Sequence, residues 1–310
     1  MLTLLLRPMF ALLALLTALM APVAQAETQR LPTPQPKRQV AVPALVRPAL
    51  WRVQRGKSVI YLFGTVHALP KDVPWMDGKV ADATEHADTL VTEILDKDPA
   101  AMRSVVMQTA MLPQGQTLRA RLSSRSREAL EKTLATDGLP GAAFDAFRPW
   151  YAAVALSTLP LMKSGYDPAN GVDVVLSRRF KDAGKAHEAL ETPEYQLGLF
   201  NKLPEDAQIR YLDEVLKDAD KIPDDLAKMI REWKAGHADE LARLMNEDES
   251  DPMLLKLLLI DRNKAWARWI KARLTRPGTV LLAVGAGHLA GKGSVQDQLA
   301  GMGIKVTRVQ

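Results

Sequence analysis

The chain has 310 residues, of which 47% are hydrophobic and 25% charged, and its formal net charge is +5. These values are ordinary for a globular protein, and they exclude a collagen, a coiled coil and a chain that is disordered throughout. Cysteine is absent, which excludes disulfides, thiolate metal sites and cysteine nucleophiles. A metal ion would therefore have to be held by His, Asp or Glu.

The first residues have the pattern of a secretory signal peptide. Arg7 is followed by the apolar run Met9–Ala21, and Ala-Gln-Ala at 24–26 is typical of a cleavage site. The apolar run holds 13 residues, whereas a membrane-spanning helix needs about 20. We therefore expect cleavage after Ala26 and release into the periplasm or the medium, with no stable membrane anchor. The alternative is an uncleaved N-terminal anchor.

A proline-rich linker is expected over residues 27–48, which hold five prolines. The leader and the linker together contain five basic residues and one acidic residue, which leaves 36 basic and 35 acidic side chains in residues 49–310. The basic character of the whole chain therefore does not indicate a nucleic-acid partner. Residues 49–310 are expected to form a single domain.

Strands are predicted near both ends of this domain. The apolar runs Leu50–Gln54 and Ser58–Phe63 flank an Arg-Gly-Lys turn and are typical of a β-hairpin. Further strands are predicted over Thr89–Ile94, His187–Leu190, Thr279–Val284 and Lys305–Val309. The run at 279–284 is apolar throughout, which indicates a strand buried on both faces.

Helical patterns fill the region between these strands, with apolar residues at three- and four-residue spacing. The predicted helices cover Val73–Ala87, Ala100–Met111, Ser123–Asp137, Phe147–Met162, Gly171–Ala183, Pro204–Ala219, Asp224–Lys234, Ala238–Asn246, Pro252–Leu274 and Ser294–Met302. This order predicts an α/β (α+β) fold. A central mixed β-sheet is built from both chain ends and flanked by helices, with a large all-helical middle insertion.

Two of the five histidines share one local pattern, an apolar strand followed by Gly-x-x-His. Gly-Thr-Val-His at 64–67 follows the strand 58–63, and Gly-Ala-Gly-His at 285–288 follows the strand 279–284. Ligands collect at the carboxyl ends of strands in a sheet covered by helices. His67 and His288 are therefore expected to converge on one point.

Glu93 is the third candidate ligand. It lies among apolar residues near the end of the predicted strand 89–94, where an ionised carboxylate is costly unless it is paired. With His67 and His288 it would complete a two-histidine, one-carboxylate set that leaves metal positions open for water. A metal in such a site lowers the pKa of bound water and prepares it for hydrolysis. The alternative is that Glu93 caps a helix or pairs with an arginine.

Six segments along the chain resemble the TraB/PrgY/GumN family. They are LFGTVHALP, LVTEI, GVDVVLSRRF, LETPEYQLGLFNKLP, DRNKAW and VLLAVGAGHLAGKGSV, in this order from about Leu50 to the C-terminus. The family is related to the Tiki metalloproteases and to the erythromycin-esterase-like and ChaN-like folds. The resemblance implies that His67, His288 and Glu93 are the metal and catalytic residues, and that the ion is divalent (manganese, cobalt or zinc).

The resemblance also points to further residues near the metal. Glu191 would bring a second carboxylate, and either Glu93 or Glu191 would transfer protons. Arg262 would hold a substrate carboxylate or an oxyanion. Asp173 and Asn263 match family positions and are expected at the substrate. Two alternatives stay open: Arg262 forms a salt bridge to Glu93 or Glu191, or Asp173 only complements a helix dipole.

The glycines of the two histidine turns, Gly64, Gly285 and Gly287, are also expected to line the substrate. The resulting interpretation is an exported, metal-dependent hydrolase that acts on a peptide or another small molecule, since the pheromone-shutdown members of the family are linked to peptide signals. One alternative is a periplasmic protein that binds a ligand such as haem without converting it. The other is an accessory protein of polysaccharide export.

Overall fold

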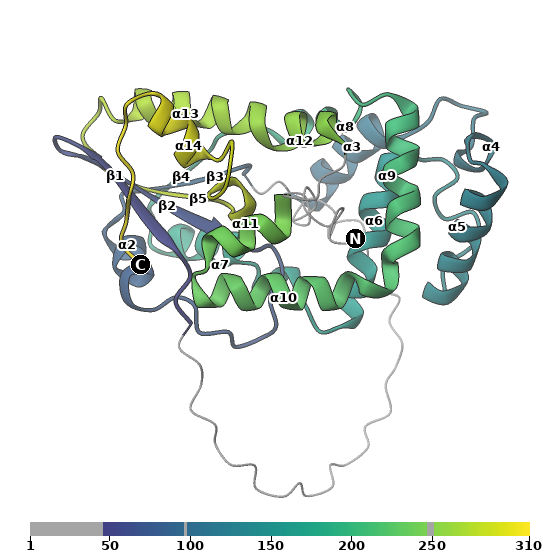
Figure 1. Cartoon of the computed structure of the whole chain (residues 1–310), viewed down its shortest axis with the longest axis horizontal. Coiled ribbons are helices and arrows are strands. Elements are labelled where there is room, and N and C mark those ends of the chain that lie inside the picture. The colour runs from purple at the N-terminus through teal and green to yellow at the C-terminus, as the bar shows by residue number, and fades with distance from the viewer. Residues whose placement is uncertain (1–45, 96–97, 247–250) are drawn as a thin grey trace, which may run out of the picture.

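The computed structural model describes residues 46–95, 98–246 and 251–310 (Figure 1). The predicted leader and residues 27–45 of the predicted linker lie outside these residues. Val46 is already buried, and the Arg47 N–H donates to the Lys234 carbonyl oxygen at 2.8 Å, so the chain is packed against the domain at this point. No helix within the described residues is long and apolar enough to cross a membrane.

A six-stranded mixed sheet runs through the described residues, and both chain ends contribute to it, as predicted. Its strands are β1 (Leu50–Arg55), β2 (Ser58–Thr65), β3 (Thr89–Thr92), β4 (Ala186–Ala189), β5 (Gly278–Gly285) and β6 (Thr307–Arg308). Their order is β4-β3-β5-β2-β1-β6. The first four in this order are parallel, whereas β1 pairs antiparallel with β2 and β6. The four parallel strands therefore end at the same edge of the sheet.

Helices cover both faces of the sheet. Successive side chains of β5 therefore alternate between two buried layers. Leu281 and Ala283 pack on one side, while Leu282 and Val284 pack on the other. The helices on the first side are α2 (Gly78–His86), α7 (Val172–Asp182), α10 (Ile222–Ala235) and α11 (Ala238–Asn246). Those on the second side are α13 (Asp261–Arg273) and α14 (Val295–Gly301).

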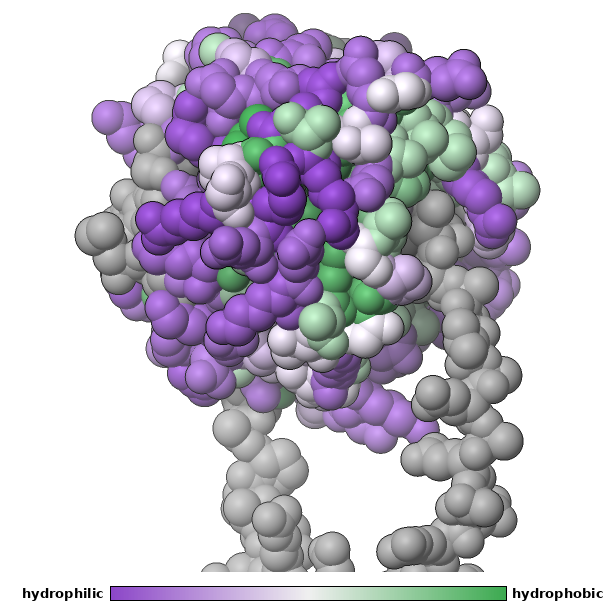
Figure 2. Space-filling model, turned by 90° about the vertical axis from the view of Figure 1, so that its right-hand side faces the viewer, coloured by the Kyte–Doolittle hydropathy of each residue, from purple (hydrophilic) through white to green (hydrophobic). Residues whose placement is uncertain are grey.

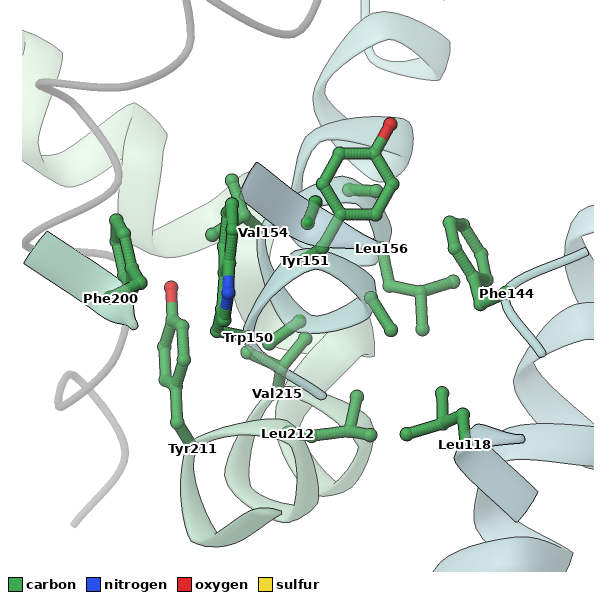
Figure 3. Close-up of a cluster of buried hydrophobic side chains, with 14 of the residues drawn as sticks. Leu118, Phe144, Trp150, Tyr151, Val154, Leu156, Phe200, Tyr211, Leu212 and Val215 are labelled. Atoms are coloured by element: carbon green, nitrogen blue, oxygen red, sulfur yellow. The ribbon is translucent and has the colours of Figure 1, made fainter. Parts of the chain in front are cut away.

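The predicted helical middle forms a lobe beside the sheet, on the right of Figure 1. It contains α3 (Pro99–Ala110), α4 (Leu118–Arg121), α5 (Ser124–Asp137), α6 (Pro149–Lys163), α8 (Pro193–Phe200), α9 (Glu205–Asp218) and α12 (Pro252–Leu255). Trp150 stacks on Phe200 in the core of this lobe, with 5.0 Å between ring centroids, and Tyr211 lies beside Phe200 (Figure 3). Hydrophilic side chains cover most of its outer face (Figure 2).

The structure confirms most predicted elements and corrects several element ends. α2 begins at Gly78 and not at residue 73, because the Asp77 side chain accepts from the Gly78 N–H and caps the helix there. β3 ends at Thr92, and the last strand pairs over two residues only. The single helix predicted over 252–274 is interrupted by a π-helical turn, Lys256–Ile260, between α12 and α13. The helices α4 and α8 were not predicted.

Candidate functional site

The predicted metal and catalytic residues meet at the carboxyl edge of the four parallel strands. His67 lies two residues after β2, and Glu93 directly follows β3. His288 ends a short helical turn after β5. Glu191 lies two residues after β4, and its N–H donates to the Glu93 carbonyl oxygen at 2.8 Å. The parallel topology thus brings residues from both halves of the chain into one place.

Arg262 on α13 joins the two carboxylates inside the protein. Its Nη2 donates to Glu93 Oε2 at 2.6 Å and to Glu191 Oε2 at 2.9 Å, and its Nε donates to Glu191 Oε1 at 3.0 Å. Its Nη1 donates to the Leu258 carbonyl oxygen at 3.1 Å and lies 3.2 Å from His288 Nε2. The arginine side chain is 1% exposed and each carboxylate side chain 6%. The group is therefore a buried, fully hydrogen-bonded ion cluster.

His288 is held in one orientation by α13. Its Nδ1 lies 2.6 Å from Asn263 Oδ1, while Asn263 Nδ2 donates to the Gly293 carbonyl oxygen at 2.9 Å. Because the amide nitrogen is used in this way, the amide oxygen accepts the Nδ1 proton of His288. The lone pair on Nε2 is then left on the side of Arg262. The Trp266 ring packs beside the imidazole, with 4.4 Å between centroids.

His67 is paired with Asp173 at the start of α7. Its Nδ1 lies 3.1 Å from Asp173 Oδ1, which is an ion-pair distance, but the direction of approach is not that of a hydrogen bond. The imidazole is buried, and its Nε2 has no hydrogen-bond partner in the described part of the chain. α7 comes this close because Gly171 precedes it. A Cβ there would lie 2.5 Å from the His67 carbonyl oxygen.

Gly285 leaves a space between the candidate ligands. Its N–H donates to Glu93 Oε1 at 2.7 Å. A Cβ on this residue would lie 3.1 Å from Glu93 Oε1 and 3.9 Å from His67 Nε2. The same Cβ would lie 3.5 Å from Cδ2 of His288. The absence of a side chain therefore keeps open the space that the carboxylate and the two imidazoles share.

The other two predicted glycines pack the turns around this space. A Cβ on Gly64 would lie 3.0 Å from both Cα and Cβ of Ala286, so a larger residue would crowd the two histidine turns where they approach each other. The Gly64 carbonyl oxygen accepts from Trp233 Nε1 at 2.8 Å. Gly287 is buried in the middle of the turn that leads to His288.

Residues 49–308 match the TraB/PrgY/gumN family. The chain belongs to this family. The uncharacterized protein YbaP of Escherichia coli (strain K12) is 26% identical over 257 residues, which are 81% of this chain and 92% of YbaP, and YbaP of Shigella flexneri gives the same values. An uncharacterized protein of Treponema pallidum (strain Nichols) is 24% identical over 279 residues, covering 83% of this chain and 82% of its own. No solved structure gives a significant match.

The charges at the edge of the sheet shift pKa values in this family member. Burial lowers the pKa of His67, but the charges of Asp173 and Glu93 outweigh it, so the net pKa is raised. Burial and the nearby Arg262 charge lower the pKa of His288 to about 3, which keeps this imidazole neutral. Burial alone would raise the pKa of Glu93, but Arg262 and the two histidines help to lower it to about 2, which keeps it ionised.

The structure contains two ion pairs that the sequence had left open as alternatives. Glu93 pairs with an arginine, and Arg262 forms ion pairs with both Glu93 and Glu191. Every N–H of the guanidinium has an acceptor within the site. To hold a substrate carboxylate or an oxyanion, Arg262 would therefore have to release one of these contacts.

Two residues that contact the carboxylates were missed as site residues. Gln196 on α8 donates its Nε2 to Glu93 Oε2 and to Glu191 Oε2, each at 2.9 Å. Trp266 was interpreted as a core residue, and it is buried, but its Nε1 also donates to Glu191 Oε1 at 2.9 Å. A helix start could have been read from the Thr-Pro-Glu sequence at 192–194, which places a capping residue before a proline.

The candidate ligands fit a divalent ion in their chemistry and in part of their arrangement. Among the described residues, no three His, Asp or Glu side chains are already arranged to hold an ion. However, His67 Nε2 and Glu93 Oε1 both border the space above Gly285, and the nitrogen is buried without a partner. His288 borders the same space with Cδ2, which is bonded to Nε2. An ion would have to replace the Arg262 contact to that nitrogen.

Proposed function

We propose that this protein is an exported hydrolase that activates water with a divalent metal ion held by His67, Glu93 and His288. The observation that carries the proposal is the orientation of the two imidazoles. In each ring Nδ1 faces a side-chain oxygen, of Asp173 or Asn263, so that Nε2 is the nitrogen that would bind an ion. Nε2 of His67 has no partner in the described residues, whereas Nε2 of His288 would exchange its contact with Arg262 Nη1 for the ion. Metal-binding histidines are usually held in this way by an oxygen on their other ring nitrogen.

Glu93 offers one oxygen to the shared space and keeps the other fixed. When bound, the ion would lower the pKa of a water molecule and supply the nucleophile for a peptide or another small-molecule substrate. Oε2 of Glu93 accepts from Arg262 and Gln196, whereas within the described residues Oε1 accepts only the Gly285 N–H. Oε1 is thus the oxygen placed to bind the ion or to accept a proton from the nucleophile.

The neighbouring residues act on this site by holding it in place. Both oxygens of Glu191 already have two donors, from Arg262, Gln196 and Trp266. In this proposal Glu191 therefore fixes Arg262 and does not carry protons. Asp173, which is partly exposed, would keep the His67 ring turned toward Glu93.

Metal content tests the proposal directly. The purified protein is stripped with a chelator and titrated with Mn²⁺, Co²⁺ and Zn²⁺ by calorimetry, and bound metal is measured by elemental analysis. We expect one ion per chain in the wild type and none in the His67→Ala/His288→Ala variant. The control is His86→Ala/His237→Ala, which changes two exposed histidines and should leave binding intact.

The outcome separates the hydrolase from its alternatives. A stoichiometric ion that is lost only in the His67/His288 variant supports the proposal and justifies a screen of peptide substrates. A wild type that binds no ion under any loading condition would overturn the mechanism and favour a protein that binds a ligand without converting it. Equal metal binding in both double variants would place the ion elsewhere.

Export has its own test. The apolar run and the Ala-Gln-Ala sequence before residue 27 support cleavage of a signal peptide. The protein recovered from the periplasm or the medium of the producing cells is expected to begin at Glu27 when its N-terminus is sequenced. An intact N-terminus in the membrane fraction would instead support an uncleaved anchor.

A further inference from the structure

Gln196 makes contacts that packing alone does not require. The side chain is 1% exposed, and its Nε2 donates at 2.9 Å to Oε2 of Glu93 and at 2.9 Å to Oε2 of Glu191. Arg262 Nη2 donates to the same two oxygens. Two nitrogens and two oxygens therefore form a closed ring of hydrogen bonds. Each of the two oxygens in the ring accepts from one charged residue, Arg262, and from one neutral residue, Gln196.

The orientation of the Gln196 amide follows from this ring. If the amide were reversed, its oxygen would lie where the nitrogen does, beside two carboxylate oxygens, and the three acceptors would repel one another. The observed orientation leaves Oε1 buried without a partner in the described structure. An unpartnered acceptor destabilises the folded protein. The hydrogen bonds to the two carboxylates are thus formed although they leave the Oε1 acceptor of Gln196 unpartnered.

A neutral donor at this position also preserves the charge of the cluster. Glu93, Glu191 and Arg262 together carry one net negative charge, and a lysine or arginine at position 196 would cancel it. An amide supplies the hydrogen bonds without adding charge. The negative charge remains available to attract a cation, and its effect is strong because the side chains of Glu93, Glu191 and Arg262 are each no more than 6% exposed.

We propose that Gln196 is a positioning residue of the metal site. By fixing Oε2 of Glu93 it turns Oε1 toward the space that His67 borders, and it thereby sets the affinity of the site for a divalent cation. This inference rests on the proposed function, because it requires an ion at Glu93. Substituting a residue that hydrogen-bonds to a metal-binding side chain, without contacting the metal itself, typically weakens metal binding by about 10- to 100-fold.

Gln208 provides a matched control for a substitution at Gln196. It is also a buried glutamine, on α9, whose Nε2 donates to the Leu203 carbonyl oxygen at 3.0 Å and whose Oε1 has no partner in the described structure. In the part of the chain that the structure describes, Gln208 makes no hydrogen bond to a site residue. Gln208→Leu therefore removes the same groups from the interior without touching the ion cluster.

The experiment measures Mn²⁺ affinity by calorimetry, and the thermal midpoint of the metal-free protein, for the wild type and for Gln196→Leu, Gln196→Met and Gln208→Leu. We expect all three substitutions to lower the midpoint. Only the two Gln196 variants should bind Mn²⁺ about 10-fold or more weakly. Methionine keeps the length of glutamine, so Gln196→Met decides the question if Gln196→Leu does not fold.

The possible results distinguish the two proposals. If the Gln196 variants bind Mn²⁺ within about 2-fold of the wild type, the positioning role is wrong and the proposed function stands. If Gln208→Leu loses as much affinity as Gln196→Leu, the effect is one of general stability, and the positioning role is again wrong. If the wild type binds no metal, the proposed function is overturned and this inference with it.

Discussion

The buried guanidinium of Arg262 gives a sharp test of how the site is held together. Arg262→Met keeps a long side chain and removes the positive charge between Glu93 and Glu191. Removing one partner of a buried ion pair costs about 3–5 kcal/mol in the free energy of unfolding. The pKa of Glu93 points in the same direction, since, against the effect of burial, Arg262 contributes most to lowering it from 4.5 to about 2.

The same substitution is expected to reverse the pH dependence of stability. In the wild type the lowered pKa of Glu93 stabilises the fold above about pH 4.5, and this contribution is lost as the pH falls toward about 2. In Arg262→Met the effect of burial is no longer opposed by the guanidinium, so the pKa of Glu93 rises. The variant should then lose stability as the pH rises from about 5 to 7, since ionising a buried, unpaired carboxylate is unfavourable.

Urea unfolding followed by circular dichroism at pH 5 and pH 7, in the presence of a chelator, measures both effects. Arg119→Met is the control, because Arg119 also pairs with two acidic residues, Glu131 and Asp145, but is 26% exposed. We expect a loss below about 1 kcal/mol for this control. The reasoning is refuted if Arg262→Met costs no more than Arg119→Met, or if its stability changes with pH as that of the wild type does.

The remaining predictions concern the space at Gly285 and the core of the helical lobe. Gly285→Ala places a Cβ 3.1 Å from Glu93 Oε1, so calorimetry should show Mn²⁺ binding weakened by about 10-fold or more in a protein that circular dichroism shows to be folded. Gly198→Ala, in α8, meets no atom within 4 Å and should bind Mn²⁺ normally while gaining about 0.5–1 kcal/mol in stability. Trp150→Ala removes the ring stacked on Phe200 and should lower the free energy of unfolding in urea by about 3–5 kcal/mol. The variant molecules that remain folded should bind Mn²⁺ with the affinity of the wild type.

The local patterns of the sequence were enough to predict the sheet and the convergence of the histidines. The apolar run 279–284 indicated a central strand, and β5 does lie between β2 and β3. The repeated Gly-x-x-His pattern placed His67 and His288 at strand ends, and the parallel order of the strands brings them together. Both results depend on features that are local in the sequence, namely strand length, glycine turns and the absence of polar residues.

The partners of the buried charges depend on distant segments and could not be predicted in the same way. Arg262 reaches Glu93 because α13 packs on the second face of the sheet, and nothing near position 262 in the sequence specifies where the helix packs. Gln196 lies on a helix of eight residues, too short for its apolar spacing to show which side faces the site. The pKa is raised in His67 and lowered in His288, because His67 faces Asp173 whereas His288 faces Arg262.

The π-helical turn Lys256–Ile260 has a consequence for how this protein can be divided. Leu258 packs in the core of the helical lobe, whereas Trp266 and Ile270 pack on the sheet, so a single helical rod belongs to both cores (Figure 1). One residue turns a helix by about 100°, so shortening this turn by one residue would rotate Arg262 away from the carboxylates if α12 stayed in place. The packing of α12 in the lobe therefore fixes the rotation of α13, and with it the direction in which Arg262 points. If the sheet were transferred to another protein without the lobe, both histidine turns would be kept. The rotation of α13 would no longer be fixed, and Arg262 would not be held beside the carboxylates.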